Sequence, residues 1–245
     1  MKLKAALLYK LSFLWRSVGI YLGFFLLFAG LFPALAVIFS NAEVGTVYSD
    51  LMIPAMIYMM IIAIVNATSD FNLFIQCGAS RMTIFLTNVI ANLTAALGLS
   101  LILVAIERLF NGNLVQHLYL DFSVITAYTQ ENIVKNWLLL SLFLFLASGI
   151  GLVAGLVLNR FTGYARLIIG AVLIGVGTLM ILLFQLLPSN VQQQLIDFLM
   201  KIFGITESGL RVLPLSVTIF VVVALLLGLA YLMNRRREIK RINAA

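Results

Sequence analysis

The sequence predicts an all-α integral membrane protein with six membrane-spanning helices, and three observations lead to this fold class. First, 63% of the 245 residues are apolar and 10% are charged, whereas a soluble domain has about 45–50% and about 25%. Second, the apolar residues form six runs, each long enough to cross about 30 Å of hydrocarbon as a helix. Third, none of these runs contains Asp, Glu, Lys or Arg.

The six predicted spans follow one another with connections of unequal length. They cover residues 17–39, 51–67, 83–106, 137–158, 167–187 and 212–233. Each span is predicted as a helix, because lipid offers no partner for backbone N–H and C=O groups and a helix satisfies them within one segment. Since no long polar stretch separates the spans, we expect residues 1–245 to form a single membrane domain.

The charged residues predict which side of the membrane each connection occupies. If the first span leaves the cytoplasm, 12 of the 16 Lys and Arg residues lie on the inner side and seven of the nine acids lie on the outer side. By the positive-inside rule, we expect both termini in the cytoplasm. The net charge of +7 is therefore explained by topology, and nucleic acid is not expected as a partner.

Residues 1–16 are predicted to form an interfacial helix of their own. Most apolar side chains of this segment share one helical arc, and most polar ones share the other. The apolar arc holds Leu3, Leu7, Leu8, Leu11, Leu14 and Trp15, and the polar arc holds Lys2, Lys10, Ser12 and Arg16. A signal peptide ending near Ala36 is the alternative. It is disfavoured because the apolar run continues to Phe39.

Two connections outside the spans are predicted to carry structure. The outer segment 188–211 has apolar residues spaced for a short amphipathic helix, which rests on the outer leaflet or dips into it. The inner loop 68–82 is predicted to form another short helix, capped by Thr68 or Ser69 and ended by Gly78, with Asp70 in its first turn.

One face of this predicted inner helix is apolar. It carries Phe71, Phe74, Ile75 and Gly78 at positions i, i+3, i+4 and i+7. Such a face suits a pocket on a partner protein, where the helix passes a displacement to the spans that it joins. Alternatively the face lies in the lipid interface and Arg81 anchors the next span.

The sequence predicts no enzyme active site and no metal site. The single histidine, His117, has no second His or Cys near it, and the single cysteine, Cys77, permits no intrachain disulfide. None of the six lysines follows a glycine, so the phosphate-binding motif G-x-x-x-x-G-K-[ST] is absent. If the chain works against a gradient, we expect a separate subunit to supply the energy.

The run from Gly78 to Phe85, Gly-Ala-Ser-Arg-Met-Thr-Ile-Phe, resembles the G-x-S-R-x-x-x-F stretch of type-2 ATP-binding-cassette exporter permeases. The resemblance extends to the order of the six spans, and it is greatest to small bacterial peptide and antimicrobial-resistance exporters of the phenol-soluble-modulin kind. Many of those permeases have a second basic residue where this chain has Met82.

The resemblance implies a multi-pass protein of the bacterial plasma membrane that exports amphipathic peptides or hydrophobic toxins. It implies that Asp70 to Gly78, with Ser80 and Arg81, dock on a separate ATPase that binds ATP and Mg. It also implies pairing with a second permease copy or a paralogue, through Gly19, Gly23, Ala171 and Gly175. The alternative function is a stand-alone bacteriocin immunity or membrane-binding protein. A secondary transporter is disfavoured because the predicted spans hold no ionisable residue.

Two sets of residues inside the spans are candidates for a substrate path. Met52, Met56 and Met59 fall near one face of the second span, where flexible thioethers accept varied apolar shapes or simply fill the core. Asn66, Asn88 and Asn92 lie towards the predicted cytoplasmic half. Because unpaired amides are costly in lipid, we expect them to face each other, a cavity or a partner.

Overall fold

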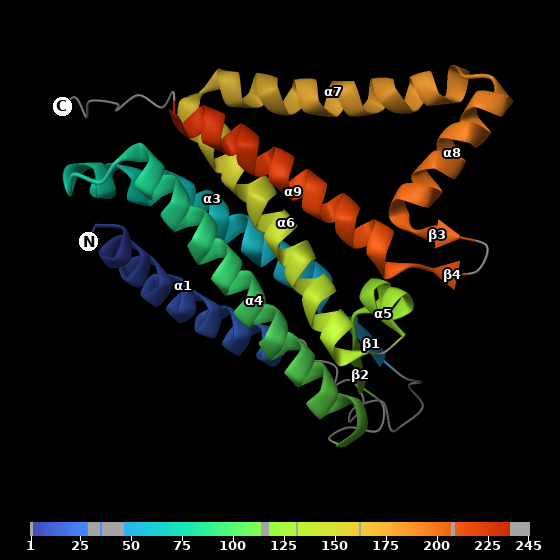
Figure 1. Cartoon of the computed structure of the whole chain (residues 1–245), viewed down its shortest axis with the longest axis horizontal. Coiled ribbons are helices and arrows are strands. Elements are labelled where there is room, and N and C mark those ends of the chain that lie inside the picture. Colours follow the sequence, from blue (N-terminus) through green and yellow to red (C-terminus); the bar gives the residue numbers. More distant parts are fainter. Residues whose placement is uncertain are drawn as a thin grey trace.

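The structure is a computed structural model that describes residues 2–28, 35, 47–113, 118–130, 132–161, 163–206 and 209–235. Long helices make up most of the described chain (Figure 1). They are α1 (Lys2–Leu26), α3 (Met52–Gln76), α4 (Arg81–Asn113), α6 (Ile133–Arg160), α7 (Tyr164–Leu186) and α9 (Val212–Arg235). Two shorter helices are α5 (Ser123–Thr129) and α8 (Ser189–Phe203).

Within the described residues, five helices are long and apolar enough to cross a membrane: α3, α4, α6, α7 and α9. They coincide with the second to sixth predicted spans, and the all-α class expected for a membrane protein is confirmed. The first predicted span is described only in part, as the second half of α1, because 29–34 and 36–39 lie outside the described residues. A sixth span and the cytoplasmic position of both termini stay predictions.

Several helices extend beyond the predicted spans. The third span was expected to end at residue 106, but α4 continues to Asn113 and includes Glu107 and Arg108. The physical reason is that hydropathy marks the part of a helix that suits lipid. The helix itself continues through charged residues, because their backbone N–H and C=O groups form the same helical hydrogen bonds as those of apolar residues.

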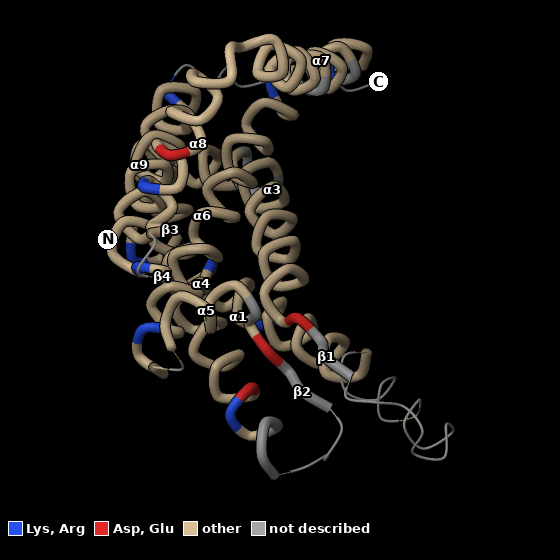
Figure 2. Tube along the Cα trace, turned by 90° about the vertical axis from the view of Figure 1, so that its right-hand side faces the viewer, with Lys and Arg blue, Asp and Glu red and all other residues tan. Residues whose placement is uncertain are grey.

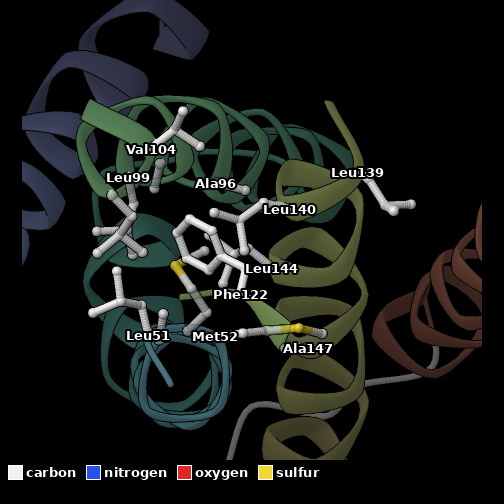
Figure 3. Close-up of a cluster of buried hydrophobic side chains, with 14 of the residues drawn as sticks. Leu51, Met52, Ala96, Leu99, Val104, Phe122, Leu139, Leu140, Leu144 and Ala147 are labelled. Atoms are coloured by element: carbon white, nitrogen blue, oxygen red, sulfur yellow. The ribbon is translucent and has the colours of Figure 1, made fainter. Parts of the chain in front are cut away.

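Helices α1, α3, α4, α6 and α9 run side by side, and their facing sides form the main core (Figure 1). Helix α6 is central, since it contacts α3, α4 and α9, while α1 packs on α4. In Figure 3, the ring of Phe122 lies among apolar side chains of α3, α4 and α6. All ten labelled side chains of this view are buried.

Small residues bring α3 and α6 close together. At Gly151 an added Cβ would overlap the backbone oxygen of Met60, and at Gly155 it would lie 2.9 Å from the Cβ of Ala67. The ridge that Ala147, Gly151 and Gly155 form therefore packs within the chain. Such close approach stabilises helix pairs by van der Waals contact where lipid provides no hydrophobic drive.

Two small sheets, which the sequence did not predict, lie at the end of the bundle where α4 finishes and α6 begins. Strands β1 (Val47–Asp50) and β2 (Leu118–Asp121) pair in parallel, and β3 (Ile205–Thr206) pairs antiparallel with β4 (Gly209–Leu210). Asp50 accepts a hydrogen bond from the N–H of Met52 at 2.6 Å, and so caps α3. Asp50 and Asp121 are the last residues of the paired strands β1 and β2, and Figure 2 shows acidic residues in red at both strands.

Helices α7 and α8 depart from the bundle (Figure 1). Among the side chains that the structure describes, none in the apolar part of α7 and none in α8 is buried. Helix α8 lies within 188–211, where a short amphipathic helix was expected, and its place at the outer leaflet stays a prediction. Its start is fixed by Gln192, whose Nε2 donates to the oxygen of Leu187 at 2.9 Å, and its end by Tyr128 and Thr218, which donate to the oxygens of Phe203 and Ile202.

The glycine contacts give a first testable prediction. Gly151→Ala will lower the thermal unfolding midpoint of the purified chain, because the new methyl group forces α3 and α6 apart at a cost of about 1–3 kcal/mol. Gly149→Ala is the matched control on the same helix, since its Cβ would meet Leu226 at an ordinary 3.6 Å. Equal midpoints for the two variants would show that the α3–α6 approach is wrong.

Candidate functional site

Helix α1 places a lysine inside the bundle. Its buried face is formed by Ala6, Lys10, Leu14 and Val18, four residues at intervals of four, and Lys10 is 0% exposed. Lys10, predicted on the polar arc of an interfacial helix, instead lies on the packed face. Leu8, on the predicted apolar arc, is 58% exposed. The reason is that helices in lipid have apolar residues on both sides, so amphipathic spacing does not identify the packed side.

The separate helix expected over 1–16 is also not observed. Residues Lys2–Leu26 form one continuous α-helix without a break at residue 16. Trp15, a member of the predicted apolar arc, lies over Gly98 of α4, where an added Cβ would overlap its ring. An interfacial location for the start of α1 stays a prediction.

Lys10 is the centre of a group that we call the polar cluster: Lys10, Asn66, Asn88 and Asn92. The Lys10 ammonium donates to the side-chain oxygen of Asn88 on α4 and to the backbone oxygen of Asn66 on α3, the latter at 3.3 Å. Asn92 lies one turn along α4 from Asn88 and is 2% exposed. Of the three asparagines, which were expected to face each other, a cavity or a partner, Asn66 and Asn88 accept hydrogen bonds from Lys10 and Asn92 lies on the same face of α4 as Asn88.

Apolar layers lie on both sides of the polar cluster. Towards the α3–α4 connection is a second group, the end cluster, made of Ala6, Phe71, Phe74 and Ile84. Towards the middle of the bundle, Leu14 and Ile62 belong to the main core, one helical turn from Lys10 and Asn66. The polar cluster is thus enclosed between two hydrophobic layers.

The predicted short inner helix is part of α3. Helix α3 runs unbroken to Gln76, and Thr68 does not cap a new helix but donates to the oxygens of Ile64 and Val65 within α3. A separate helix was expected because polar residues follow the apolar span. However, nothing in 68–76 breaks a helix, and a chain that is already helical extends more easily than a new helix starts.

The connection between α3 and α4, residues 73–82, is called the tip. Gly78 has φ of 72°, as predicted for the residue that ends the helix. The N–H of Gly78 donates to Ile75 at 2.8 Å and that of Ala79 to Phe74 at 2.9 Å, which is a Schellman motif. Ser80 then caps α4, since its hydroxyl accepts from the N–H of Thr83 at 3.1 Å.

Arg81 joins the tip to the end of α9. Its guanidinium donates to the backbone oxygen of Arg235 at 2.9 Å, and Asn234 donates back to the oxygen of Arg81 at 2.9 Å. A cation at the carboxyl end of a helix is also favoured by the helix dipole. Phe85, one turn further along α4, contacts the ring of Tyr231. Gly78, Ser80, Arg81 and Phe85 of the quoted motif therefore all have contacts or conformations that the fold requires.

Phe71 and Phe74 do not form the exposed aromatic face that the sequence predicted. They are 2% and 4% exposed, because α1 packs over them in the end cluster and Tyr9 meets Phe74 edge to face. Ile75 is half-buried against the same cluster, and the side chain of Asp70 lies outside the described residues. The side chains that the tip does expose are those of Leu73, Gln76, Cys77, Ser80, Arg81 and Met82.

The methionines proposed for a substrate path lie in or against the core, whereas the small residues proposed for pairing lie on the surface. Met52 and Met59 are buried in the main core and Met56 packs against it, so in this structure they fill the bundle. Gly19, Gly23 and Gly175 would meet nothing within 4 Å if a Cβ were added, and Ala171 is exposed. These four positions are therefore not used for packing within the described chain, and their role in pairing stays a prediction.

No group of three or more His, Cys, Asp or Glu side chains is arranged for a metal among the described residues; His117 lies outside them. Comparison with protein-family models, curated proteins and solved structures finds no match to this chain.

Burial of Lys10 can be tested by chemical labelling. An amine-reactive ester applied to the protein in lipid nanodiscs will modify Lys4, which is exposed, at least about tenfold faster than Lys10, which is enclosed. Mass spectrometry of the digested protein measures both rates, and denaturation in detergent should make them equal. Similar rates before denaturation would contradict the polar cluster.

Proposed function

We propose that the chain is the permease subunit of an ATP-driven exporter, with ATP hydrolysed on a separate subunit that docks at the tip. The substrate class that we propose is an amphipathic peptide or a hydrophobic toxin, and the membrane is the bacterial plasma membrane. The proposal includes pairing of two permease chains, in which the exposed small residues of α1 and α7 are available for contact.

The observation that carries the proposal is the construction of the tip. It joins two long helices through four residues, Cys77 to Ser80, and both helix ends are capped within the connection. Arg81 adds a third helix through its bond to Arg235. A push on the exposed side chains of such a rigid connection moves α3, α4 and α9 together, which suits the transfer of motion from an ATPase.

This tip differs from the predicted docking element in the side chains that it offers. Phe71 and Phe74 are used inside the chain, whereas Leu73 and Met82 are 45% and 47% exposed. Substitution of the two phenylalanines would damage the end cluster and would not test docking. The contact surface is therefore best tested at Leu73, Cys77 and Met82.

Cys77 is exposed and is the one cysteine of the chain, so it serves as a reporter of docking. Labelled with a maleimide photo-crosslinker, the permease should crosslink to a co-expressed ATP-binding-cassette ATPase encoded beside it. Leu73→Asp and Met82→Asp should reduce the crosslinked and co-purified ATPase at least about tenfold, which equals about 1.4 kcal/mol of binding.

Leu210→Asp, at the opposite end of the bundle, is the matched control and should leave recovery of the ATPase unchanged. Cys77→Ser should abolish crosslinking, because the crosslinker then has no thiol to attach to. If neither tip variant reduces recovery, or if the ATPase is not recovered with the unmodified chain, the docking assignment is wrong.

A further inference from the structure

The polar cluster contains more hydrogen-bonding capacity than the chain uses. Both polar atoms of the Asn66 amide, Oδ1 and Nδ2, are buried without a hydrogen-bond partner among the described residues, and so is Oδ1 of Asn92. Each of these two residues is 2% exposed. A buried amide that makes no hydrogen bond is destabilising, and an apolar side chain of similar size would avoid that cost.

The unused atoms define the hydrogen-bonding chemistry that a bound group must have. Two are acceptors and one is a donor, so the group must both donate and accept hydrogen bonds. The neighbouring ammonium of Lys10 disfavours a cation, and the two amide oxygens disfavour an anion. One peptide group satisfies two of these atoms, because its N–H donates to one asparagine oxygen and its C=O accepts from Nδ2 of Asn66, and the N–H of the next peptide group suits the other oxygen.

We infer that Lys10, Asn66, Asn88 and Asn92 form a binding site for a neutral amide, in the form of a main-chain peptide group of the transported substrate. The choice of a peptide as the source of the amide rests on the proposed function. Within the site, Lys10 and Asn88 hold each other in position across α1 and α4, while Asn66 and Asn92 present the open hydrogen-bonding atoms.

The two hydrophobic layers give the site a defined entrance. Leu14 and Ile62 of the main core close it towards the middle of the bundle, so a ligand group does not pass through in this conformation. On the other side the end cluster is formed by few residues, and Phe71 and Phe74 are its only aromatic members among the buried residues. Movement of these two rings, which belong to the helix that leads into the tip, would open the site.

The site can be tested without an ATPase, using two small probes. N-acetyl-leucine N′-methylamide carries two peptide groups, and its matched control, N-acetyl-leucine methyl ester, lacks one N–H. With the chain in nanodiscs, the methylamide at about ten times its dissociation constant should raise the unfolding midpoint by about 3 °C relative to the ester.

Variants of the asparagines separate a binding site from a structural role. Asn66→Leu should raise the midpoint of the chain without probe and remove the difference between the two probes. Asn92→Leu should do the same and serves as the second variant if the first does not fold. The matched control is Asn136→Leu on α6, a buried asparagine whose side chain bonds Thr129. This substitution should lower the unfolding midpoint of the chain without probe and keep the difference between the methylamide and the ester.

The inference is overturned if methylamide and ester act equally, if neither acts, or if the difference survives both Asn66→Leu and Asn92→Leu. It is also overturned if these variants lower the midpoint without probe, since the amides would then be structural. Because no ATPase is present, a positive result together with a failed docking experiment would retain the site and reject the exporter. A negative probe result together with successful docking of the ATPase would reject the amide-binding site and retain the exporter.

Discussion

The burial of the Lys10 ammonium is the constraint on which the arrangement of the bundle depends. A charged group removed from water costs several kcal/mol unless hydrogen bonds compensate it, and here the compensation comes from α3 and α4 together. Helix α1 can therefore pack in one rotation only. That rotation buries Ala6, Leu14 and Val18, turns Leu8 outwards and brings α1 over the end cluster.

The consequences extend along the whole interface of α1. One helical turn before Lys10, Ala6 packs on the rings of Phe71 and Phe74. This contact stabilises the last turns of α3 beyond its apolar span. Two helical turns after Lys10, the hydroxyl of Tyr58 on α3 donates a hydrogen bond to the hydroxyl of Ser17 on α1 at 3.0 Å, and the ring of Tyr58 stacks on that of Tyr21. The tip is thus held at the end of a helix pair that α1 supports, and Arg81 ties it to α9. The packing of α1, the burial of Lys10 and the position of the proposed docking surface at the tip therefore depend on one another.

The sequence allowed the prediction of features that depend on local rules. The apolar spans correspond to helices because their length and lack of charge leave no alternative in lipid. The end of the helix at Gly78 was predictable because a helix end favours a residue that adopts the left-handed conformation.

Features that depend on which face of a helix is covered were not predictable. Lys10 was missed because lipid and core are both apolar, so the spacing of Leu3, Leu7 and Leu14 fits either side. The signal that was present is the row of Ala6, Leu14 and Val18 at intervals of four, which continues past the supposed end of the interfacial helix with Lys10 in its place. Phe71 and Phe74 were misplaced for the same reason, since an aromatic face is equally suited to a partner protein and to α1.

The position of α1 against α4 is the claim that most of this account requires, and crosslinking in native membranes tests it directly. In a Cys77→Ser background, cysteines at Ala6 and Ile84, which share the end cluster, should form a disulfide on mild oxidation. Cysteines at Leu8 and Ile84 should not, because Leu8 faces away from the bundle. A disulfide that forms equally well in both pairs, or better in the second, would contradict the burial of α1 and of Lys10.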